Sequence, residues 1–180
     1  MNGNKKTADE MMWKDENGNT VTLHQIVQAV YQTISKEEHA KQMTLSKAKA
    51  LIEAVEKEAE KQGTKAVISV CNAQGNPVAV HVMDGAFLVS FDAAVKKAYS
   101  AAAVRMPTLE LAKIAVPGET FYGVDKLDQG RITVIGGGVP LMYGDVLCGA
   151  IGVSGGTGEE DHALAVKAAD MFQSLCLHAE

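Results

Sequence analysis

Residues 65–83 have the sequence KAVISVCNAQGNPVAVHVM, in which two apolar runs flank a short polar segment. The runs at 65–72 and 77–83 are rich in valine and isoleucine, which favour β-strands. The four residues between them include Gly75 and Asn76 and are typical of a turn. We therefore predict a β-hairpin. Both runs are apolar on both strand faces, which predicts a sheet covered on each side.

Helical and strand-like patterns alternate on either side of this hairpin. Apolar residues recur three and four positions apart in four segments, which predicts helices at 44–62, about 90–106, 108–115 and 157–175. Further strands are predicted at 131–135, 139–142 and 146–153, and their short connections favour antiparallel pairing. The main elements then have the order α-β-β-α-β-β-β-α. This order predicts an α+β fold, profilin-like or PAS-like, with a five-stranded, meander-like antiparallel sheet and flanking helices.

The first part of the chain differs from this domain in composition. Residues 22–36 place apolar side chains on one face of a helix, namely Leu23, Ile26, Val27, Val30 and Ile34. The charged stretch 35–42 has no apolar period and predicts a hinge or a frayed helix end. We therefore predict an N-terminal extension over residues 1–42 and a domain over residues 43–180.

Composition excludes several classes of protein. The chain has 180 residues, a net charge of −5 and 47% hydrophobic residues, which indicates one globular domain with an extension rather than a disordered chain. No membrane-spanning run and no secretory signal are apparent, so we expect a cytoplasmic protein that does not bind membranes. The acidic balance argues against nucleic-acid binding. The three cysteines lie in apolar runs and are expected to be reduced and buried.

Few residues indicate catalysis. Ser154 lies in a G-x-S-x-G pattern at 152–156, but the acid and base of a hydrolase would both have to come from the short segment that follows. On the second strand of the hairpin, His81 and Met83 share one face, and both are residue types that haem iron accepts as ligands. The alternative is a histidine whose ring binds a backbone carbonyl at the sheet surface.

Two glycine-rich segments and one helix face are candidate ligand contacts. The triglycine at 136–138 would let a flat ligand approach the backbone, or would only turn a hairpin. The turn at 155–157 leads into a helix N-terminus, whose free N–H groups favour an anion, or is an ordinary tight turn. Lys96, Lys97 and Tyr99 on the helix at 90–106 could meet propionates or phosphates, or face solvent.

Nine motifs, in this order, carry a resemblance to a known family, and the five longest are N-A-Q-G-N-P-V-A at 72–79, M-D-G-A at 83–86, K-A-Y-S-A at 97–101, G-G-G-V-P at 136–140 and G-A-I-G-V-S-G-G-T at 149–157. They resemble the GlcG/HbpS family, which includes the C-terminal domain of the PduO cobalamin adenosyltransferase. The resemblance spans about residues 44–175. It implies a profilin-like fold, homo-oligomers from dimers to octamers, and binding of haem, with a corrinoid suggested for some members.

The resemblance also selects candidate site residues. The positions that match its motifs are Met83, Asp84, Gly85, Lys97, Tyr99, Gly136, Gly137, Gly138, Gly155, Gly156 and Thr157. His81 lies outside the motifs and is added as a candidate metal ligand. We expect these segments to lie together around a glycine-lined hollow that binds a planar ligand and contains no catalytic side chain.

These expectations define a function. We expect a non-catalytic binding protein for haem or a related tetrapyrrole (corrinoid), acting as carrier, sensor or accessory in a cobalamin-, diol- or glycolate-linked pathway. Relatives occur beside genes of bacterial microcompartments, so the helix at 22–36 could dock on a shell protein, or pack on its own domain or a neighbouring subunit. The alternatives are a small lyase, isomerase or hydrolase that uses Tyr99, Lys97, Asp84 or Ser154 on a carboxylate metabolite, and a scaffold without a ligand.

Overall fold

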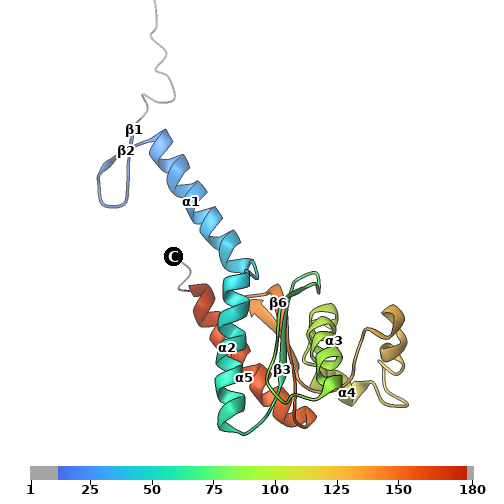
Figure 1. Ribbon diagram of the computed structural model, residues 1–180. Coiled ribbons are helices and arrows are strands. Elements are labelled where there is room, and N and C mark those ends of the chain that lie inside the picture. The colour runs from blue at the N-terminus through green and yellow to red at the C-terminus, as the bar shows by residue number, and fades with distance from the viewer. Residues whose placement is uncertain (1–11, 178–180) are drawn as a thin grey trace, which may run out of the picture. The chain divides into compact units, whose positions relative to one another are not determined.

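The structure is a computed structural model that describes residues 12–177 (Figure 1). The described residues form two compact units, one ending at Ala40 and the other beginning at Lys41. The first unit contains a hairpin of strands β1 (Met12–Lys14) and β2 (Thr20–Thr22), which the sequence did not predict, followed by helix α1 (Leu23–Lys41). No helix within residues 12–177 is long and apolar enough to cross a bilayer.

Helix α1 is longer than predicted. The expected hinge or frayed end at 35–42 is wrong, because the helix continues to Lys41. Lysine, glutamate and alanine in this stretch are good helix formers and need no apolar partner to extend a helix that has already begun.

The second unit contains the remaining elements: α2 (Leu45–Lys61), β3 (Val67–Asn72), β4 (Pro77–Val82), α3 (Leu88–Val104), α4 (Thr108–Ile114), β5 (Gly138–Tyr143), β6 (Val146–Ser154) and α5 (Gly158–Leu177). Its sheet has the order β4-β3-β6-β5, and every neighbouring pair is antiparallel. The predicted hairpin is confirmed, since β3 pairs with β4 from Val67↔Val82 onward. The unit is therefore a mixed α+β fold, as expected.

The predicted fifth strand at 131–135 is wrong, and so is the meander. The sheet of this unit has four strands. The Thr133 N–H donates to Oγ of Ser100 on α3 at 2.8 Å, instead of to a neighbouring strand. Strand β3 pairs directly with β6, with Ile68 opposite Val153, so the two hairpins of the sheet join through these central strands.

The two faces of the sheet are packed differently. Helices α2 and α5 lie on one face and α3 lies on the other (Figure 1). The α2/α5 face holds the larger side chains of the core, among them Leu51, Ile52, Val55, Ile68, Leu141, Ile151, Leu164 and Phe172. The α3 face is built from small residues, namely Cys71, Ala98, Ala101, Ala102 and Ala150. Helix α3 can therefore approach the sheet closely, and this approach shapes the region of the glycine turns.

Candidate functional site

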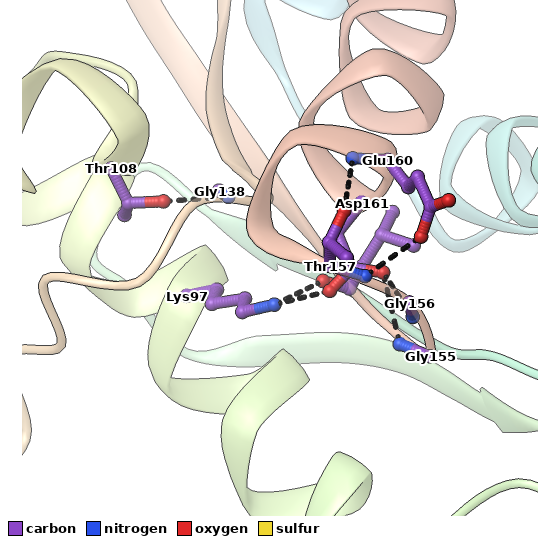
Figure 2. Close-up of polar contacts among 9 residues, drawn as sticks. Lys97, Thr108, Gly138, Gly155, Gly156, Thr157, Glu160 and Asp161 are labelled. Carbon is purple, nitrogen blue, oxygen red and sulfur yellow. Dashed lines mark hydrogen bonds and ion pairs between the residues drawn. The ribbon is translucent and has the colours of Figure 1, made fainter.

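A buried ion pair joins α3 to α5 (Figure 2). Nζ of Lys97 lies 2.7 Å from Oδ2 of Asp161, and each side chain is only 2% exposed. The same Nζ donates to the carbonyl oxygen of Val153 at 2.9 Å. Burial lowers the pKa of Lys97, and its hydrogen bond to Asp161 opposes that shift. Lys97 is thus an internal partner of Asp161 and does not lie on a solvated helix face.

The turn at 155–157 is occupied by the chain's own side chains (Figure 2). Oδ1 of Asp161 accepts the N–H groups of Gly155 and Gly156, each at 2.9 Å. Thr157 and Glu160 form a capping box, in which Thr157 N donates to Glu160 Oε2 at 2.9 Å and Glu160 N to Thr157 Oγ1 at 3.2 Å. The carboxylates of Asp161 and Glu160 therefore bind the free N–H groups of this turn, where the sequence analysis placed the anion of a ligand.

The triglycine serves close packing. A Cβ on Gly137 would lie 2.5 Å from the Val153 oxygen and 2.9 Å from Lys97 Nζ, and one on Gly138 would lie 2.3 Å from the Lys97 carbonyl oxygen. The Gly138 N–H donates to Thr108 Oγ1 at 2.8 Å (Figure 2). The predicted glycine-lined hollow is therefore wrong: backbone, together with the Lys97 and Asp161 side chains, fills the space between the two glycine turns.

Tyr99 lies at a second location. Its hydroxyl donates to Oδ2 of Asp128 at 2.5 Å, and the guanidinium carbon of Arg131 lies 3.7 Å from the ring centroid. The hydrogen bond to Asp128 raises the pKa of Tyr99. Asp128 and Gln129 adopt positive φ angles of 48° and 57°, which non-glycine residues rarely do. Tyr99 thus holds a strained loop, and the neighbouring pocket of about 130 Å³ is too small for a tetrapyrrole.

A third location has two of the predicted residues in its lining. A pocket of about 390 Å³ lies beside α2 and the end of β4, and its lining consists of Glu56, Glu60, Lys65, Val82, Met83 and Asp84. Gly85, with φ of 85°, belongs to the turn in which the Ala86 N–H donates to the Met83 carbonyl at 3.0 Å. Met83 and Asp84 therefore line the pocket and Gly85 belongs to the turn that carries them, while His81 lies on β4 outside the lining.

His81 is held by a carboxylate. Its Nδ1 lies 2.8 Å from Oε1 of Glu56 on α2, and the two side chains are 35% and 26% exposed. A carboxylate at this distance favours the tautomer with the proton on Nδ1 and leaves the lone pair of Nε2 for another partner. Histidine ligands of metals commonly have such a second partner. The ring of His81 therefore binds the carboxylate of Glu56 and not the backbone carbonyl that was the alternative expectation.

Glu56 was missed by the sequence analysis. It lies 25 positions before His81, so no local motif links the two residues. One signal was present, since Glu56 and Glu60 are four residues apart on α2 and therefore share a helix face. Two acidic residues on one face of a helix that packs on the sheet could have marked Glu56 as a partner for His81.

The described residues contain little that indicates catalysis. Within residues 12–177 no group of three or more His, Cys, Asp or Glu side chains could hold a metal ion. Ser154 is buried at the end of β6, where it pairs with Val67. The three cysteines are buried and free, as predicted, and burial raises the pKa of Cys71 to about 11.

The chain folds into a small α+β domain with an open surface pocket beside α2 and the end of β4. The family model described as "Haem degrading protein HbpS-like" matches residues 43–170. The chain therefore belongs to the HbpS-like family, as its motifs implied.

Known proteins resemble the chain over most of this region. An uncharacterized 15.0 kDa protein of the dhaT-dhaS intergenic region of Citrobacter freundii is 38% identical over 142 residues, which are 79% of this chain and 100% of that protein. The corrinoid adenosyltransferase PduO of Citrobacter freundii is 34% identical over 137 residues, which are 76% of this chain but only 41% of PduO. The crystal structure of a PduOC:heme complex has 32% identity and a TM-score of 0.69, covering 72% of this chain and 94% of that one.

Proposed function

We propose that this protein binds haem at the pocket beside α2 and β4, as a non-catalytic carrier, sensor or accessory of a cobalamin-, diol- or glycolate-linked pathway. The observation that carries the proposal is the contact of the His81 imidazole with Glu56, whose side chain also lines the pocket. The similarity to the chain of the PduOC:heme complex supports it. A corrinoid is the related alternative, because it also places a metal ion in a flat macrocycle.

Three groups at or beside the pocket suit such a ligand, whereas Glu56, Glu60 and Asp84 make the rest of its lining mainly acidic. Haem, when bound, supplies an iron ion that accepts an axial nitrogen or sulfur ligand. Nε2 of His81 is the proposed donor, and Met83 presents a second soft donor to the pocket. Lys65 offers an ammonium group for a ligand carboxylate. Lys97, Tyr99 and the two glycine turns make internal contacts of the fold and are not proposed to contact the ligand.

Haemin titration tests the proposal directly. We expect micromolar protein to give a saturable shift of the Soret band, because a nitrogen donor at the iron and a less polar surrounding both change the haem spectrum. Absence of any change in the Soret band would reject the proposal that this protein binds haem. A parallel titration with cobalamin tests the corrinoid alternative.

The description of the family favours haem degradation as a second candidate function. Ring opening requires dioxygen and a reductant, so the haem-loaded protein is incubated in air with ascorbate. Under the binding proposal the Soret band persists. Decay of the Soret band, together with release of iron and a ring-opened pigment, would show that the protein degrades haem and would reject the carrier function.

We also propose that the protein is a homo-oligomer. Large apolar side chains are exposed at the end of β4 and the start of α3, and they are Val82, Phe87, Leu88, Val89 and Phe91, with Leu88 96% exposed. Exposed apolar patches of this kind are typical of protein interfaces. A second copy of the chain is the proposed partner, and light scattering during size-exclusion chromatography measures the assembly.

Helix α1 is the proposed contact with a microcompartment shell protein. Ile26, Val27, Val30, Tyr31 and Ile34 are exposed on it. We expect Val30→Asp to reduce co-assembly with shell protein at least about tenfold, because a charge in a helix-in-groove contact is buried without a partner. Gln28→Asp, also exposed on α1, is the matched control. Unchanged co-assembly of the Val30 variant would assign the helix to its own domain or a neighbouring subunit.

A further inference from the structure

We infer that Cys148 and Cys176 form a redox-sensitive pair, which a small hydroperoxide closes to a disulfide. This inference does not depend on the haem binding proposed above. Both residues are reduced thiols in the structure, and both belong to the core on the α2/α5 face of the sheet. Cys148 lies in β6 and Cys176 in the last turn of α5, so a bond between them would tie the end of this helix to the sheet.

The two thiols interact electrostatically. Burial raises the pKa of Cys148, and the nearby Cys176 thiol raises that pKa further. The ammonium group of Lys47, in the first turn of α2, opposes the effect of burial on the pKa of both thiols. Coulombic effects of this kind need groups that lie close together, and α5 packs directly against β6. Both thiols therefore lie in one small region beside the start of α2.

Both cysteines lie where the backbone can adjust. The register of β5 with β6 shifts between Leu141 and Met142, and Cys148 is the extra residue of the resulting β-bulge. Cys176 precedes the last residue of α5, and the ends of helices open at a lower cost in free energy than the core does. Small movements at these two positions can therefore provide the specific geometry that a disulfide requires.

Cys148 is the thiol that an oxidant reaches first. It lines a surface pocket of about 280 Å³ together with Met43 and the side chains around the start of α2, although it is only 1% exposed. Cys176 lies outside this lining. A small, uncharged oxidant such as hydrogen peroxide fits a pocket of this size. Cys148 is therefore the thiol that is oxidised first, and Cys176 is the thiol that resolves the product.

The reaction balances with one molecule of peroxide. The Cys148 thiolate attacks one peroxide oxygen, the O–O bond breaks, and a sulfenic acid forms while the departing hydroxide takes up the thiol proton as water. The Cys176 thiolate then attacks the Cys148 sulfur, the S–O bond breaks, and a second water leaves with the proton of Cys176. The two thiols lose two electrons and two protons in total, and the peroxide gains them.

The third cysteine provides a matched control. Cys71 lies on the α3 face of the sheet, where its Sγ donates to the carbonyl oxygen of Ala98 at 3.5 Å. It is 1% exposed, as Cys148 is, so burial alone does not distinguish the two thiols. The variants Cys148→Ser, Cys176→Ser and Cys71→Ser therefore make the same chemical change inside and outside the proposed pair.

The folded full chain is treated with hydrogen peroxide, its remaining thiols are alkylated, and intact mass and peptide maps are recorded. We expect the wild type and Cys71→Ser to lose the mass of two hydrogen atoms, to yield a peptide that links Cys148 to Cys176, and to regain both thiols with dithiothreitol. Cys176→Ser should stop at a sulfenic acid on Cys148, which dimedone traps. Cys148→Ser should form no disulfide.

Three results would overturn the pair. They are the absence of any link in folded wild-type protein, a link through Cys71, and a link between two protein molecules on a non-reducing gel. Equal dimedone labelling of Cys71 and Cys148 in Cys176→Ser would also reject it, because it would mean that the reagents react with unfolded chains. Circular dichroism shows that each variant is folded. A failed haemin titration leaves this inference intact, and a missing disulfide leaves haem binding intact.

Discussion

Replacement of Lys97 by methionine is expected to lower the free energy of unfolding by about 3–5 kcal/mol, as measured by urea denaturation. Methionine fills a similar volume but leaves the Asp161 carboxylate inside the molecule with no cation beside it. The N–H groups of Gly155 and Gly156 still bind Oδ1, but Oδ2 loses its donor at 2.7 Å. The Val153 carbonyl also loses its hydrogen bond from Nζ.

Lys96→Met is the matched control for this prediction. Lys96 precedes Lys97 on the same helix, and its Nζ lies 3.0 Å from Oδ2 of Asp92 in an exposed ion pair. Exposed pairs contribute at most about 1 kcal/mol, so this variant should unfold close to the wild type. Equal midpoints for the two methionine variants would mean that the buried pair does not stabilise the loop at 155–157.

The elements that the sequence predicts well are those with local causes. The hairpin at 65–83 follows from two β-rich runs around a short turn, and the structure pairs them. Helix α2 begins after Thr44, whose Oγ1 accepts the Lys47 N–H at 3.2 Å, and α5 begins with the capping box of Thr157. These signals lie within a few residues of the structure that they cause, so one sequence suffices to find them.

The features that the sequence does not reveal depend on distant residues. Pairing of β3 with β6 joins residues 77 to 87 positions apart, from Asn72↔Gly149 to Val67↔Ser154. The glycine turns look like a ligand site until Lys97, 64 positions before Asp161, is seen to fill the space between them. Periodicity of two did place His81 and Met83 on one face, but the contact of His81 with Glu56 depends on the packing of α2 on the sheet.

The close approach of α3 to the sheet also predicts a large effect of Gly152→Ala. A Cβ on Gly152 would lie 2.1 Å from the carbonyl oxygen of Ala94 and 2.5 Å from the amide nitrogen of Ala98. These are backbone atoms, so no side chain can turn aside and α3 itself must move. Overpacking usually costs about 1–3 kcal/mol, and we expect about 3 kcal/mol or more here because a whole helix is displaced.

Gly158→Ala is the control, because it replaces a glycine by alanine at a position where the added Cβ meets no clash. Gly158 is the first residue of α5, and a Cβ there would have no atom closer than 3.4 Å. Alanine favours a helix over glycine, so this variant should be as stable as the wild type or more stable by up to about 1 kcal/mol. Thermal and urea unfolding of both variants provide the comparison. A Gly152→Ala protein as stable as Gly158→Ala would show that α3 does not press on β6, and the packing that also buries Lys97 would need another explanation.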